Sequence, residues 1–144
     1  MTTLIRAAAA AATAMTLAIL PAGAGETPAP EGAAVYFVGL EDGATVSNPV
    51  TIRFGAKGIG VAPAGVEKEK TGHHHLLINA ALEGDDFDYA IPADDNHRHF
   101  GGGQTEVTLE LPAGTHTLQL VMGDHGHVPH DPPVMSEVIT ITVE

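Results

Sequence analysis

Apolar and polar residues alternate along most of the chain after residue 33, and many of the apolar ones are β-branched. A period of two places apolar side chains on one face of a strand and polar side chains on the other. Gly, Pro, Asp and Asn gather between these runs, as in "EDGATVSNP" (41–49) and "PAG" (112–114), and indicate turns. The pattern predicts seven β-strands, at residues 34–40, 50–56, 73–80, 87–91, 105–111, 115–122 and 136–143.

Seven short strands separated by turns predict an all-β fold, a single immunoglobulin-like antiparallel β-sandwich of about seven strands. No window after the N-terminal segment has a helical period. The Cys–Trp–Cys hallmark of antibody domains is absent, because the chain contains neither Cys nor Trp. The sandwich prediction therefore depends on the strand pattern alone, and an up-and-down barrel is the alternative.

The N-terminal segment has a different pattern. Residues 7–20 are an apolar run of 14 that follows Arg6, which suits a signal-peptide core but is short for a membrane span of about 20 residues. Ala22 and Ala24 give the small-x-small form that signal peptidase accepts. We expect a signal peptide over residues 1–24, a disordered Pro- and Ala-rich lead-in over 25–33, and the sandwich over 34–144; a permanent anchor is the alternative. The expected location is periplasmic or secreted, with no membrane span after cleavage.

Charge and cysteine content narrow the classes of partner. Beyond residue 24 the chain keeps all 18 acidic residues and five of the six basic ones, a formal charge of −13. Nucleic acid and anionic membranes are therefore poor partners, since Lys and Arg supply that attraction. The absence of Cys excludes thiolate metal sites. A bound metal would have nitrogen, oxygen or thioether ligands.

The nine histidines are unevenly placed. Three begin the predicted strand 73–80, two lie before the strand 105–111, and three lie in "GDHGHVPHDPP" (123–133). If the strands alternate in direction, the loops that carry these eight emerge at one end of the sandwich. His116 begins its strand about 20 Å away, at the other end, and is excluded from any shared site.

Clustered neutral imidazoles favour copper or zinc. Residues two apart on a strand point the same way, so His73 and His75 share a face and His74 takes the other. The alternative is a polar rim in which histidines order long loops. The predicted metal ligands are His73, His75, His97, His99, His125, His127 and His130.

Other residues near these histidines have candidate roles. Acidic and amide groups can accept the free imidazole N–H and orient a ligand, and Met122 and Met135 offer thioethers to Cu(I) or simply pack in the core. The glycines of "GGGQ" (101–104) lack the strand–loop–helix context of a phosphate cradle. We expect them to let the histidine loops approach closely. The candidate orienting residues are Asp124, Asp131, Glu106 and Gln104.

The segments that contain the histidines also resemble a known protein family. "TGHHHLLIN" (71–79), "HFGGGQTE" (99–106) and "LPAGTHTLQLVMGDHGHVPHDPPVMSEVITITV" (111–143), with "GIGVAPAGV" (58–66), resemble a family of small exported bacterial proteins catalogued as a domain of unknown function. The resemblance implies an exported single domain and names no ligand. Periplasmic copper-binding β-sandwich proteins of the copper-resistance type are similar in size, export and histidine usage only. Copper–zinc superoxide dismutase shares His-x-His ligands but not this spacing.

These observations predict a periplasmic metal-binding protein, for copper or zinc, that acts in sequestration or delivery. The alternative is a non-enzymatic cell-envelope module whose histidine-rich end grips a protein or glycan partner. We expect no enzymatic activity, because the only serines after residue 24 are Ser47 and Ser136 and neither lies in a nucleophile motif. The expected partners are a metal ion and an envelope protein.

Overall fold

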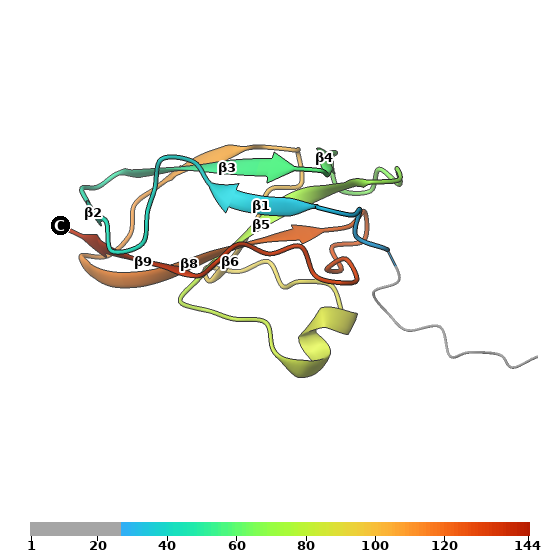
Figure 1. Cartoon of the computed structure of the whole chain (residues 1–144). Helices are drawn as coiled ribbons and strands as arrows, with labels where there is room; N and C mark the ends of the chain where they lie inside the picture. The colour runs from blue at the N-terminus through green and yellow to red at the C-terminus, as the bar shows by residue number, and fades with distance from the viewer. Residues whose placement is uncertain (1–26) are drawn as a thin grey trace, which may run out of the picture.

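The fold is a sandwich of two β-sheets, seen in a computed structural model that describes residues 27–144 (Figure 1). The predicted signal peptide lies outside the described residues. The smaller sheet has the order β1-β3-β7, and the larger has the order β2-β9-β8-β5-β4 with β6 also paired to β5. The strands are β1 (Ala34–Phe37), β2 (Thr45–Val46), β3 (Val50–Lys57), β4 (Gly60–Val61), β5 (Thr71–Ile78), β6 (His97–His99), β7 (Glu106–Leu109), β8 (Gly114–Gly123) and β9 (Ile139–Val143).

The main core lies between the two sheets, as strand alternation requires. Val50, Ile52 and Phe54 of β3 face Leu118 and Leu120 of β8 within one buried cluster. The pairs β1–β3, β3–β7, β5–β8 and β8–β9 are antiparallel, and only the two-residue strands β2 and β4 pair in parallel. The all-β, sandwich-like fold expected from the sequence is therefore confirmed, together with six of the seven strands.

The predicted strand at residues 87–91 is wrong. A short 3-10 helix, η1 (Gly84–Asp88), occupies that part of the chain. Local hydrogen bonds favour it, since the Asp86 carboxylate accepts the backbone N–H of Glu83 and the Asp86 N–H donates to the Glu83 carbonyl. Short acidic side chains of this kind compete with strand ladders for backbone groups.

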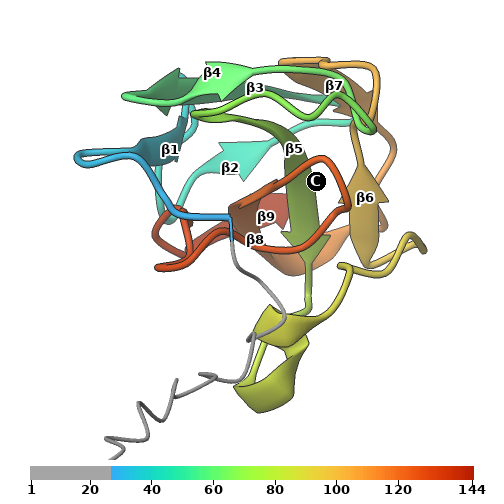
Figure 2. The same cartoon turned by 90° about the vertical axis from the view of Figure 1, so that its right-hand side faces the viewer.

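The long connection between β5 and β6 covers the outer face of the larger sheet (Figure 1). Leu82 and Ile91 from this connection bury Leu77 of β5 and Val121 of β8 in a second, smaller cluster. Figure 2 shows the same connection on the side of the larger sheet away from β3 and β7. The outer face of β5 is thus apolar at one end, and its other end carries histidines.

The chain before β1 packs against the domain from Thr27 onward. Asp131 N–H donates to the Thr27 carbonyl at 3.0 Å, and Ala29 N–H donates to the Asp131 carbonyl at 2.9 Å. Residues 27–29 are therefore hydrogen-bonded, which differs from the disordered lead-in expected over 25–33. Within residues 27–144, no helix has the length and apolar content to cross a membrane.

Candidate metal centre

Strand β5 divides its three consecutive histidines between the two faces of the larger sheet. His74 points inward, where its ring centroid lies 5.3 Å from that of Phe54. His73 and His75 point outward, with ring centroids 4.8 Å apart. All three are completely buried, so the outward pair is covered by other residues although it lies outside the main core.

His99 reaches this pair through the register of β5 and β6. His75 and His99 are cross-strand partners, and the bond from Phe100 N–H to the His74 carbonyl marks the adjacent pair as the hydrogen-bonded one. The His75–His99 pair is therefore of the non-hydrogen-bonded kind, in which side chains lie closest. The ring centroids of His75 and His99 are 5.1 Å apart, and those of His73 and His99 are 5.0 Å apart.

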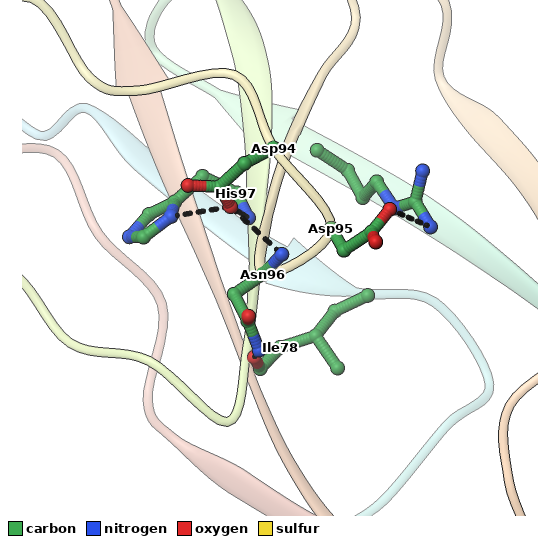
Figure 3. A network of polar contacts seen from close by, with 6 residues as sticks. Ile78, Asp94, Asp95, Asn96 and His97 are labelled. Carbon is green, nitrogen blue, oxygen red and sulfur yellow. Dashed lines mark hydrogen bonds and ion pairs between the residues drawn. The ribbon is translucent and has the colours of Figure 1, made fainter.

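A network around Asp94 anchors β6 in this register (Figure 3). The Asp94 carboxylate accepts the backbone N–H groups of Asn96 and His97 at 2.8 and 2.9 Å. The Asn96 side-chain amide donates to the carbonyl of Ile78 at 2.7 Å. His97 Nδ1 lies 2.9 Å from the same Asp94 oxygen, so the ring of His97 is paired with Asp94.

His127 comes from the β8–β9 connection and completes the group. Its Nδ1 lies 3.2 Å from His73 Nε2, and its ring centroid is 4.6 Å from that of His99. His73 Nε2 is also 3.0 Å from His75 Nε2. One nitrogen from each of four rings therefore meets the other three within 4.8 Å; we call His73, His75, His99 and His127 the histidine tetrad.

Two glycines leave room for the tetrad. A Cβ at Gly101 would stand 2.4 Å from His99 Cε1, and a Cβ at Gly123 would stand 2.9 Å from His75 Nε2. Both separations are shorter than side chains tolerate, so any larger residue would displace a ring. The close approach at the "GGGQ" turn is by the ring of His99, two residues before Gly101 in the same segment.

Burial keeps His73 and His75 neutral. It lowers the pKa of His73 from 6.5 to about 4 and that of His75 from 6.5 to about 3, with the neighbouring imidazoles as a further cause. The pKa of His99 is lowered for the same reasons. Neutral imidazole has the free lone pair that a metal needs, so at pH 7 His73 and His75 can coordinate an ion without first losing protons.

The spacing of the nitrogens suits one metal ion. Zinc–imidazole bonds of about 2.0–2.1 Å in a tetrahedron put ligand nitrogens about 3.3 Å apart. Two of the nitrogen–nitrogen separations in the tetrad, 3.0 and 3.2 Å, are close to that value. The nitrogens of His73 and His75 that meet are Nε2, and the buried Nδ1 atoms of the same rings have no hydrogen-bond partner among the described residues. The tetrad can therefore hold a metal ion through nitrogen alone.

Three of the predicted ligands lie elsewhere. His97 is held by Asp94, His125 is exposed, and His130 is buried with its ring nitrogens 3.3 and 3.2 Å from the carbonyls of Met122 and Thr71. The structure thus brings together four of the seven, from the three segments that the sequence placed at one end.

The remaining candidates are also outside the tetrad. His116 bonds to Asn79 and to the Pro112 carbonyl, apart from the group as expected. Met122 is in the main core, and Met135 packs against the second cluster.

The four residues expected to orient the ligands bond to other groups. Glu106 pairs with Arg53, and the Gln104 side chain accepts the Gly102 N–H. Asp131 bonds through its backbone to residues 27 and 29. Asp124 accepts N–H groups from its own loop and the hydroxyl of Thr27. Thr27 was missed from the sequence, because it lies in a segment expected to be disordered.

Residues 52–144 match the family described as Domain of unknown function (DUF4399). The chain belongs to this family. The match spans most of the sandwich and includes the whole histidine tetrad, in agreement with the resemblance seen in the histidine-bearing blocks. No curated protein and no solved structure matches the chain significantly. The family has no assigned activity, so the function of this member must be argued from its own residues.

Proposed function

We propose that this protein binds a copper or zinc ion at the histidine tetrad, for sequestration or delivery in the periplasm. The observation that carries the proposal is the meeting of four imidazole nitrogens, from β5, β6 and the β8–β9 connection, within 4.8 Å. A cation shared by the four rings would be bound by one nitrogen from each of them. An all-imidazole donor set suits Cu²⁺ and Zn²⁺ and is poor for Mg²⁺ or Ca²⁺.

The exposure of the tetrad supports exchange of the ion. His73 and His75 are fully buried, His127 is half-buried and His99 is exposed. An ion at the tetrad would therefore rest on a buried pair and face solvent on the side of His99. A site with one open side can pass its ion to a partner protein by ligand replacement, which a closed structural site cannot do readily.

Binding without catalysis is part of the proposal. Ser136, one of two serines after residue 24, is nine-tenths buried, and its hydroxyl bonds to the Leu120 N–H and the Glu137 carbonyl. The tetrad includes no carboxylate that could act as a base on a metal-bound water. Export by the predicted signal peptide would place the protein in the periplasm, where we propose that it takes up the ion.

The direct test is titration of the metal-free protein with Cu²⁺ and with Zn²⁺ by isothermal calorimetry. We expect one ion per chain, and loss of that site in a His73→Gln/His75→Gln variant. His125→Gln is the matched control, because His125 is exposed and lies only two residues from His127. It removes a histidine from the same loop and should leave binding unchanged.

Two results would reject the proposal. One is binding no tighter than that of an unstructured histidine-rich peptide, and the other is equal loss of affinity in the His125→Gln control. An envelope module that uses these loops to grip a protein or glycan predicts partner capture that persists in a strong chelator, together with no stoichiometric metal site.

A further inference from the structure

The fourth member of the tetrad, His127, lies in a tight turn between Asp124 and Val128. His127 has a φ of 70°, a left-handed conformation that a non-glycine residue adopts only at a cost. Two backbone bonds hold it there: its N–H donates to the Asp124 carbonyl at 3.0 Å, and its carbonyl accepts the Ile91 N–H at 2.9 Å. The direction of the His127 ring therefore depends on the conformation of the turn from Asp124 to Val128.

The Asp124 side chain organises this turn. Its Oδ1 accepts the backbone N–H of Gly126 at 2.8 Å and that of Val128 at 3.0 Å, the two residues on either side of His127. Asp124 is only 6 % exposed. Charge-assisted hydrogen bonds that a buried carboxylate accepts are among the stronger ones in proteins, so removing this carboxylate would release both neighbours of His127.

Thr27 holds Asp124 from outside the loop. The Thr27 hydroxyl donates to Asp124 Oδ2 at 2.7 Å, across 97 residues of sequence. The backbone of Thr27 is fixed in turn by its bond from Asp131 N–H. Both oxygens of the carboxylate are thus engaged, one by the metal-site loop and the other by the segment that precedes β1.

We propose that Thr27 and Asp124 form a clamp that positions His127 as a metal ligand, so that the N-terminal segment controls whether the site has four ligands or three. Thr27 and Asp124 are positioning residues, since they contact the ligand loop and not the ion. The inference rests on the proposed metal binding. Groups that orient ligands typically change metal affinity by about 10–100-fold when substituted.

The experiment uses the mature chain loaded with Co²⁺, whose visible absorption reports ligand number. Thr27→Val keeps the shape of threonine and removes the hydroxyl, whereas Thr27→Ser retains the hydroxyl. We expect Thr27→Val and Asp124→Asn to shift the Co²⁺ spectrum toward that of His127→Ala and to weaken affinity by about 10-fold or more. Thr27→Ser and Thr51→Val, a matched change at an exposed strand position, should retain the wild-type spectrum.

A wild-type spectrum and affinity in both Thr27→Val and Asp124→Asn would overturn the clamp while leaving the metal site in place. If Asp124→Asn does not fold, Thr27→Val decides the question by itself. Hydrogen exchange of the Gly126 and Val128 amides in metal-free protein adds a readout that needs no ion. Faster exchange in Thr27→Val supports the clamp, and unchanged exchange argues against it. Absence of any metal binding by the wild-type chain would instead reject the proposed function.

Discussion

The metal-free protein should lose stability as the pH falls from 7.5 to 5.0. In the unfolded chain a histidine takes up a proton near pH 6.5, whereas burial keeps His73 neutral in the folded protein down to a pKa of about 4. Between these two values the unfolded state binds more protons, so the free energy of unfolding decreases as the pH is lowered. The pKa of His75 is lowered to about 3, which acts in the same direction.

The size of the effect follows from the pKa of His73. One pKa unit corresponds to about 1.4 kcal/mol. Lowering the pKa of one histidine from 6.5 to about 4 reduces the free energy of unfolding by about 2 kcal/mol at pH 5. The shifts of His73 and His75 include repulsion between the same two rings. Their contributions therefore do not add, and we expect this pair to account for a loss of roughly 2–3 kcal/mol at pH 5. The pKa values of Asp94 and Asp124 are lowered from 3.8, so these carboxylates lose their stabilising effect only below this window.

Urea denaturation followed by far-ultraviolet circular dichroism, with a chelator present at both pH values, measures this difference. The His73→Gln/His75→Gln variant should lose the part of the pH dependence that these two residues contribute, whatever its absolute stability, because Gln does not titrate. His74, whose pKa is also lowered by burial, remains in the variant and keeps its own contribution. His125→Gln should keep it. Equal stability of the wild-type protein at pH 7.5 and 5.0, or an undiminished fall in the double variant, would show that the buried pair is not held neutral.

Three further outcomes are expected. A metal concentration 100-fold above the dissociation constant should raise the free energy of unfolding by about 2.7 kcal/mol at pH 7.5, and scanning calorimetry should show no such rise in the His73→Gln/His75→Gln variant. Gly101→Ala should weaken metal binding about tenfold by displacing His99, whose ring a new Cβ would meet at 2.4 Å; wild-type affinity by calorimetric titration would contradict this. N-terminal sequencing of the exported protein should begin at Gly25; an uncleaved chain in the membrane fraction would support the anchor alternative.

Much of the strand pattern could be predicted because alternation is a local property. The period of two in residues 115–122 placed Leu118 and Leu120 correctly in the main core. It failed at residues 87–91, where the side chain of Asp86 offered the backbone a competing set of hydrogen bonds. It also missed β6, a three-residue strand whose position depends on the Asp94 network and on pairing with β5.

The sequence by itself determined that His73 and His75 share one face of a strand and His74 takes the other, because side-chain direction along a strand follows from chain geometry. It also placed the histidine loops at one end of the fold. Only the tertiary structure decided that His99 and not His97 joins the pair, through a register set by distant hydrogen bonds. Likewise, the turn held by Asp124 brings His127 into the tetrad and leaves His125 exposed. Ligand choice among neighbouring histidines depends on strand register and on long-range contacts, neither of which a local pattern encodes.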